Sequence, residues 1–512
     1  MGCLADAELW PEPATLALRA SDDRMELDVR VDTRVSVRRR GTADVFRIGL
    51  PVALAVILLW LSDVITDLPP ALAAWATLIG ILWLTALGFT RSRAAGENPW
   101  LSPSFIHMLY VVALQYGLGI LFLLYGEFLA DYMNWDTRGI FELQESIPRA
   151  SWLIMIGALG TYAGMYVPVG AIARRLPALA WPENQRTFPL RALLIAPLTI
   201  AAYLYSFTGG ALGEIQQTAY IIGTFGLVLM MCGFMRLLRG GAHLAAWRLV
   251  TGAVIVMFVG TLLFGGSRGV LMYVVMYYVW ALIAVKGKAS RGLIVVALLG
   301  IMVFSVVVFP LLSVYKFHRK GGLVPIGEAV QRTIEDYDSA AGEPRFAGSI
   351  EMLRATTYPA TYVASYERIM PDVYPYLFGE SPRVVLSGLV PRLVNPDKAN
   401  VLDYVRGLAY RAGLFTEQTY FEAEQLGAIM IDYISEFYIN FGPWGVLLFS
   451  LVQGIYLRIR YEWLIIRSRL DLGFPVYAVS FLTASAFWQM FVLDIKNWAI
   501  WIALLWLCSR RN

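Results

Sequence analysis

Long apolar runs recur along most of the chain, and short polar segments separate them. A helix needs roughly 20 consecutive apolar residues to cross a bilayer, and most of these runs have about that length. The short alternating strands of a membrane β-barrel do not dominate the sequence. We therefore predict an all-α integral membrane protein with about twelve membrane-spanning helices. They lie at residues 48–65, 71–90, 105–125, 151–172, 190–207, 215–235, 246–264, 269–285, 292–314, 438–457, 473–492 and 496–508.

The polar segments between the runs alternate in charge. Segments 67–70 and 208–214 contain no Lys or Arg, and segment 126–150 is acidic. Short loops rich in Lys and Arg stay on the cytoplasmic side of the membrane, which predicts that both chain termini are cytoplasmic. The basic residues assigned to that side include Arg40, Arg91, Arg93, Arg174, Arg175, Arg458, Arg460, Arg510 and Arg511.

This topology divides the chain into four parts. It predicts a cytoplasmic tail at 1–46, nine helices at 47–314, one large extracytoplasmic loop folded as a cap at 315–437, and three helices with the C-terminus at 438–512. Apolar and polar residues alternate over 26–38, as in a β-strand. A lone strand is not stable, so this segment is either a tail without a catalytic role or a strand that pairs with a cytoplasmic partner.

Composition supports a membrane protein. The 512 residues are 58% hydrophobic and only 16% charged, whereas soluble domains carry about 25% charged residues. The net charge of +4 is too small to argue for a nucleic-acid partner. The histidines have no metal-ligand spacing and the cysteines lie far apart, so we expect no metal, disulfide or cofactor. These residues are Cys3, Cys232, Cys508, His107, His243 and His318.

A glycine-rich segment, Gly265–Gly269 (GGSRG), lies between two predicted spans on the extracytoplasmic side. Ser267 can cap the following helix, whose free N–H groups then face outward. Together with Arg268 this arrangement suits a phosphate group. The alternative is a short turn whose arginine reaches the membrane interface.

Three cations, Arg383, Arg392 and Lys398, lie among prolines in the predicted cap. Proline restricts the backbone, so such cations can be held in place. Arginine offers a planar fork for two phosphate oxygens, and lysine a point charge. The alternative is an ordinary charged surface loop.

Glu436 and Asn440 are four residues apart and share one helix face where the chain returns to the membrane. Ionisable groups at such depth are costly and usually face a cavity or a partner. Glu436 is therefore a candidate base, with Asp432 as a rival one turn earlier and Tyr438 in support. The alternative is an interfacial carboxylate paired with an arginine of the cap.

Other polar and aromatic residues give weaker indications. Asp336 and Asp338 resemble a metal-binding Asp-x-Asp, but the topology places them away from nucleotide sugars. Five tyrosines of the cap can stack on sugar rings, or equally pack its core or line the membrane interface. They are Tyr358, Tyr362, Tyr366, Tyr374 and Tyr376.

Three segments follow one another in a characteristic order: Tyr376–Ser381 (YLFGES), Pro391–Lys398 (PRLVNPDK) and Ser435–Gly445 (SEFYINFGPWG). Together they resemble the bacterial O-antigen and oligosaccharide repeat-unit polymerases. The resemblance implies a fold similar to the C-superfamily membrane glycosyltransferases, located in the bacterial inner membrane. The family more often has an aromatic residue where Val394 or Asn395 stands, and proline in place of Ala399.

The resemblance also implies a reaction. A sugar hydroxyl on one polyprenyl-pyrophosphate-linked unit attacks the anomeric carbon of the chain on another, building O-antigen, capsule or exopolysaccharide. Arg268, Arg392 and Lys398 would stabilise the leaving pyrophosphate, with Ser267 and Arg383 in support, and Glu436 would accept the hydroxyl proton. The implied partners are membrane lipids, a chain-length regulator and a flippase.

Two other functions stay open. A ligase that moves finished glycan to another acceptor has a similar topology, but such ligases tend to use a loop histidine, and His318 lies at the edge of the loop. A transporter of the lipid-linked unit would carry charges inside its spans and show inverted repeats. The predicted spans have few central charges, and the large loop has no evident use in transport.

Overall fold

The computed structural model describes most of residues 41–512. It leaves out 1–40, 126–142, 181–186, 209–212, 241–242, 264–268, 340–346, 391–393, 411–431, 469–471, 483–486, 510–512 and parts of 305–323 and 396–409. The alternating segment 26–38 therefore lies outside the described residues.

All regular structure in the described part of the chain is helical. Six helices are long and apolar enough to cross a membrane: Pro70–Ala94, Pro103–Leu124, Thr187–Ser206, Thr218–Arg239, Tyr433–Arg467 and Phe491–Cys508. Shorter apolar helices lie at Arg47–Trp60, Leu244–Gly260 and Val274–Lys286. The predicted all-α fold with apolar helices of membrane-spanning length is thus confirmed, while the number of twelve spans stays a prediction.

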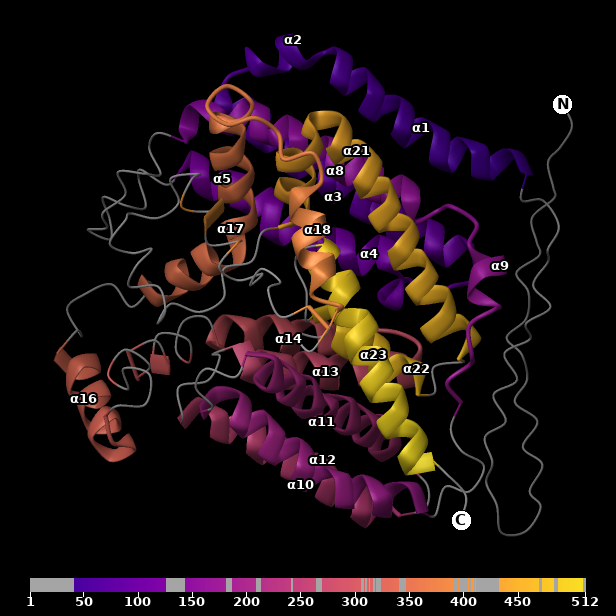
Figure 1. Ribbon diagram of the computed structural model, residues 1–512, viewed down its shortest axis with the longest axis vertical. Coiled ribbons are helices and arrows are strands. Elements are labelled where there is room, and N and C mark those ends of the chain that lie inside the picture. The colour runs from indigo at the N-terminus through magenta and orange to yellow at the C-terminus, as the bar shows by residue number, and fades with distance from the viewer. Residues whose placement is uncertain are drawn as a thin grey trace, which may run out of the picture. The chain divides into compact units, whose positions relative to one another are not determined.

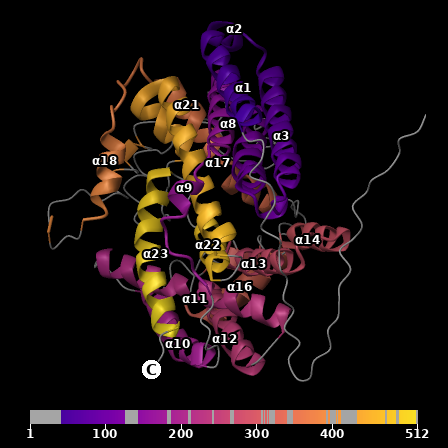
Figure 2. The ribbon, with the colours of Figure 1, turned by 90° about the vertical axis from the view of Figure 1, so that its right-hand side faces the viewer.

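The helices pack around two hydrophobic cores (Figures 1 and 2). The first core is built mainly by α1 (Gly41–Trp60), α3 (Pro70–Ala94), the run η2–α5 (Met108–Leu124), α8 (Ile147–Gly164), α17 (Ala347–Ile369) and α21 (Tyr433–Tyr461). The second is built mainly by α10 (Thr187–Thr208), α11 (Gly213–Arg239), α12 (Leu244–Leu263), α13 (Gly269–Lys286), α22 (Gly473–Leu482) and α23 (Phe487–Ser509). Short or peripheral helices are α2 (Ser62–Thr66), α9 (Gly170–Ala173), α14 (Arg291–Val303), α16 (Ile326–Ser339) and α18 (Glu380–Ser387).

Helix α21 links the two cores and packs most closely on α8. Gly164 on α8 meets Gly454 on α21, and a side chain at Gly164 would collide with the backbone of Leu451. Small residues at a helix crossing allow the two backbones to approach closely, which favours dispersion contacts in a membrane, where the hydrophobic effect between helices is absent. This packing fixes the axial position of α21 relative to α8.

The chain reverses direction inside α21, at Gly442. The rings of Phe437 and Phe449 lie 5.5 Å apart, and those of Phe441 and Phe449 are stacked at 5.0 Å. In a straight helix, residues twelve positions apart are separated by about 18 Å. Gly442 has φ 66° and ψ −161°, a conformation open essentially to glycine alone, and Pro443 follows it. Helix α21 is therefore a hairpin with a short first limb, 433–441, and a long second limb, 443–461; its gold ribbon bends back at the upper end in Figure 1.

Two arginines assigned to a cytoplasmic loop lie within helix instead. Helix α21 continues through Arg458 and Arg460 into the π-helix η7 (Glu462–Arg467). Arg460 is only 1% exposed, and its guanidinium lies 3.3 Å from the Asp494 carboxylate on α23. Arg460 and Asp494 neutralise one another. Both residues can therefore lie in the apolar interior, although charged residues are more typical of loops.

The same ion pair explains a wrong helix boundary. The sequence pattern places a break between spans 473–492 and 496–508, where Asp494 is the charged residue. In the structure α23 runs without interruption from Phe487 to Ser509, and α22 ends at Leu482. Asp494 is internal to α23, paired with Arg460 and bonded to the Tyr456 hydroxyl.

Candidate functional site

The short limb of the α21 hairpin holds a segment from the predicted cap. The backbone N–H of Leu377 donates to the carbonyl of Ile439 (2.9 Å), and that of Phe378 donates to the carbonyl of Asn440 (3.0 Å). The last carbonyls of a helix have no partner within it. The segment 377–378 supplies partners for two of them, so two of the three stretches that carry the family resemblance lie in direct contact.

The side chain of Asn440 stabilises the contact between segment 377–378 and the first limb of α21. Its Oδ1 accepts the N–H groups of Gly379 (3.1 Å) and Ser381 (3.3 Å), and its Nδ2 donates to the Ser381 hydroxyl (3.1 Å). Nδ2 also donates to the carbonyl of Glu436, at 2.6 Å. Asn440 is therefore a positioning residue that fixes the start of α18 against the first limb.

Glu436 completes the same network. The Ser381 hydroxyl donates to Glu436 Oε1 at 3.0 Å, and the Glu436 side chain is only 2% exposed. The carboxylate is thus withdrawn from water and held by one hydroxyl donor, and its role as a base stays a prediction. The role of Ser381 is not predictable from the sequence, because a serine beside a proline in a loop gives no indication of a partner 55 residues away.

The backbone around Phe378 has a conformation that non-glycine residues rarely adopt. Phe378 has φ 45° and Gly379 φ 92°, and Phe378 is 77% exposed. A left-handed non-glycine residue costs free energy and persists only where its surroundings enforce it. Here the bonds to Ile439 and Asn440 enforce it, and the ring of Tyr376 packs directly on Gly442, where a Cβ atom would lie 3.0 Å from the ring.

Asp432 begins the first limb and is completely enclosed. Its Oδ1 accepts the backbone N–H of Ser435 (3.0 Å), as an N-cap residue does, and the hydroxyl of Tyr116 (2.6 Å). Tyr116 belongs to the π-helix η2 (Met108–Gly117). Burial raises the pKa of the Asp432 carboxyl from 3.8 to about 6, and the two hydrogen bonds offset this effect only in part. Oδ2 has no hydrogen-bond partner among the described residues.

We expect Asp432 to make the protein less stable as the pH rises from about 4 to about 6. Its ordinary pKa is 3.8 and its pKa in the folded protein is about 6, so the folded state binds the extra proton in this window and loses stability as that proton leaves. A difference of about two pH units corresponds to about 3 kcal/mol in the free energy of unfolding. Asp432→Asn keeps the helix cap but does not titrate.

The measurement is the unfolding midpoint in detergent across this pH range for wild type and Asp432→Asn. The variant should show the weaker pH dependence and the higher stability at neutral pH. Equal slopes for the two proteins would contradict the assignment of this titration to Asp432.

The structure brings together only part of the predicted site. Glu436, Asn440 and Tyr438 lie on the first limb, and the Tyr438 hydroxyl donates to the carbonyl of Met370 (2.8 Å), which is a structural tie. Arg383 lies on α18, exposed, one turn after the segment held by Asn440. Ser267, Arg268, Arg392 and Lys398 lie outside the described residues.

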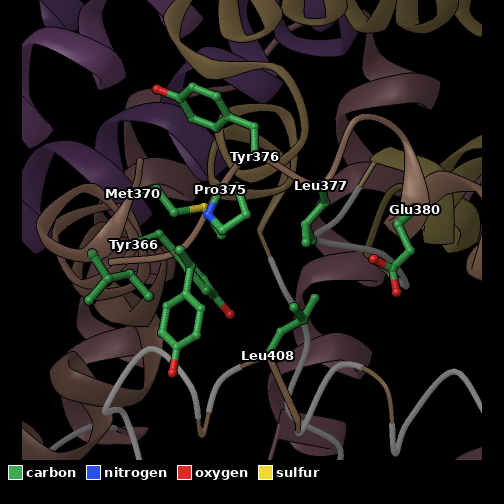
Figure 3. Close-up of a pocket in the computed structure, with 9 residues that line it drawn as sticks. Tyr366, Met370, Pro375, Tyr376, Leu377, Glu380 and Leu408 are labelled. Atoms are coloured by element: carbon green, nitrogen blue, oxygen red, sulfur yellow. The ribbon is translucent and has the colours of Figure 1, made fainter. Parts of the chain in front are cut away.

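The tyrosines of the predicted cap separate into two groups. Tyr362 and Tyr366 on α17 are buried in the first core, as expected for packing residues. Tyr374 is partly exposed, and Tyr376 is half-buried beside Tyr438. Tyr374, Tyr376 and the edge of Tyr366 line a cavity of about 260 Å³ next to the hairpin (Figure 3). In the described part of the chain, no three His, Cys, Asp or Glu side chains gather as a metal site would require.

No model of a known protein family, no curated protein and no solved structure matches this chain. The resemblance to the polymerases therefore stays a prediction based on three segments.

Proposed function

We propose that this protein is an integral-membrane glycosyltransferase that joins polyprenyl-pyrophosphate-linked oligosaccharide units. The observation that carries the proposal is the network of Glu436, Ser381 and Asn440. It holds a buried carboxylate at a helix reversal, next to a cavity lined with aromatic rings. It lies at the start of Tyr433–Arg467, a stretch long and apolar enough to cross a membrane, which suits a substrate carried on a lipid.

The reaction needs one base and one set of cations. Glu436 takes the proton from an acceptor hydroxyl while that oxygen forms a bond to the anomeric carbon of the donor. The bond between the anomeric carbon and the pyrophosphate oxygen breaks, and its electron pair leaves with the lipid pyrophosphate. Low polarity around the buried carboxylate strengthens its interaction with the hydroxyl. The donor is already activated, so no nucleotide takes part.

Cations have to stabilise the departing pyrophosphate. Arg383 lies on α18, whose first residues are bonded to Asn440, and is thus held near the network. Ser267, Arg268, Arg392 and Lys398 are the further candidates from the sequence. We place this site on the outer side of the bacterial inner membrane, within twelve spans, with residues 315–437 as a cap and both termini in the cytoplasm.

A transporter of lipid-linked oligosaccharide is the second candidate, because of one observation. Arg460 and Asp494 form an ion pair inside helices that are long and apolar enough to cross a membrane. Charges at such positions are typical of transport pathways, as are helices that reverse within the membrane. Transport does not require the network of Glu436, Ser381 and Asn440, so the transporter is the second candidate.

The test uses the full chain, purified in nanodiscs, with the lipid-linked repeat units of its host and no nucleotide sugar. Products separated by size should form a ladder of repeat multiples, with release of lipid pyrophosphate. A single larger product that appears only when another acceptor is added would indicate a ligase. Movement of the unit across a proteoliposome without any product would indicate the transporter and overturn the proposal.

A further inference from the structure

The cavity beside the hairpin combines apolar walls with one carboxylate. Met370, at the end of α17, and Pro375 form one wall, and Leu408 faces them (Figure 3). Glu380, the first residue of α18, lies on the opposite side from Met370 in the same view. Sites for small ligands are commonly mostly apolar, with a few polar groups that fix the orientation of the ligand.

The walls are held by contacts with the limb of α21 that carries the candidate catalytic network. The carbonyl of Met370 accepts the Tyr438 hydroxyl at 2.8 Å, and the N–H of Leu377 donates to Ile439 at 2.9 Å. Glu380 directly precedes Ser381, which donates to Glu436. A ligand in the cavity is therefore positioned relative to Glu436 by one short, rigid segment.

The lining distinguishes among the parts of the proposed substrates. A pyrophosphate group would be repelled by the exposed carboxylate of Glu380, because the two groups carry like charges. An isoprenoid chain offers no hydrogen-bond donor to that carboxylate. A sugar ring suits both features: its C–H face packs on aromatic and apolar side chains, and its hydroxyls donate to the carboxylate. Tyr366 adds a buried hydroxyl that has no hydrogen-bond partner among the described residues.

We propose that this cavity binds a sugar ring of the acceptor oligosaccharide beside the limb of α21 that carries Glu436. That the sugar belongs to the acceptor rests on the proposed function. The binding of sugar to the cavity can be tested without catalysis. The residues expected to contribute most are Tyr374, whose side chain is partly exposed at the cavity, and Glu380.

The experiment measures binding of the lipid-free repeat-unit oligosaccharide, released from its carrier by mild acid, to the full chain in nanodiscs. Tyr374→Ala should raise the dissociation constant about two- to tenfold, the range expected for loss of one aromatic contact, and Glu380→Gln should weaken binding as well. The matched control is Tyr205→Ala on α10, because Tyr205 is 39% exposed and Tyr374 is 38% exposed. In the polymerisation assay, Tyr374→Ala should raise KM for the acceptor with kcat little changed.

The outcomes separate this inference from the proposed function. Sugar binding that Tyr374→Ala weakens, without any polymerisation, would support the cavity as a sugar site and overturn the polymerase. Polymerisation that neither Tyr374→Ala nor Glu380→Gln affects would support the polymerase and overturn the sugar site. Displacement of the oligosaccharide by inorganic pyrophosphate with unchanged affinity in Glu380→Gln would also overturn it, because the cavity would then take the phosphate end.

Discussion

Replacing Glu436 by glutamine is expected to slow chain extension by about 10²–10⁴-fold, the usual contribution of a positioned general base. Glutamine has nearly the same size and can still accept the hydrogen bond from the Ser381 hydroxyl. It cannot take a proton. The loss should appear in kcat and only weakly in KM, because Glu436 acts on the acceptor hydroxyl as the new bond forms. The measurement is the initial rate of ladder formation in nanodiscs at saturating lipid-linked substrate.

Ser381→Ala is the matched control for this variant. It removes the hydrogen bonds of the Ser381 hydroxyl to Glu436 and from Asn440 and keeps the carboxylate, so we expect a loss of about tenfold, as for a hydrogen bond to a charged group. The unfolding midpoint of each variant in detergent shows whether the fold is intact. A Glu436→Gln protein that is folded and extends chains within twofold of the wild-type rate would remove Glu436 from the mechanism. Asp432 would then be the carboxylate to test next.

Replacing Arg460 by methionine is expected to lower the free energy of unfolding by about 3–5 kcal/mol, the usual cost of leaving one buried charge without its partner. Arg460 and Asp494 are each 1% exposed. Arg460 also donates to the Ser480 hydroxyl (2.6 Å), and its guanidinium lies 5.7–5.8 Å from the ring centres of Trp498 and Tyr456. The removal of arginine therefore leaves an enclosed carboxylate that water cannot solvate.

The double variant Arg460→Met/Asp494→Leu separates the loss of the ion pair from the cost of the remaining charge. It should recover most of the lost stability, because apolar side chains of similar volume often replace a buried pair without loss. Arg332→Met is the control, since Arg332 and Glu328 form an ion pair on α16 with side chains 49% and 47% exposed. Exposed pairs of this kind contribute about 0.3–0.5 kcal/mol. Equal losses for Arg460→Met and Arg332→Met would show that the Arg460 pair is screened by water.

Some features of the site could be predicted from local sequence. Glu436 and Asn440 were expected on one helix face because of their spacing, and they act in one network. The segment Tyr376–Ser381 was singled out as a motif, but the role of Ser381 and the hydrogen bond between Asp432 and Tyr116 were missed. The two partners in that bond are 316 residues apart, and neither residue type indicates the other. The phosphate-binding residues Ser267, Arg268, Arg392 and Lys398 stay predictions.

Local sequence was sufficient for the all-α class and for helices of membrane-spanning length, because apolar runs of this length can satisfy their backbone polar groups only as helices within a bilayer. It was not sufficient for the chain reversal at Gly442, since Gly-Pro also occurs in ordinary turns and kinks. Packing of Tyr376 on Gly442 and of α21 on α8 decided that geometry. The ion pair of Arg460 and Asp494 has the same origin. A charged residue is typical of a loop until a partner from another helix neutralises it, and only the tertiary structure supplies that partner.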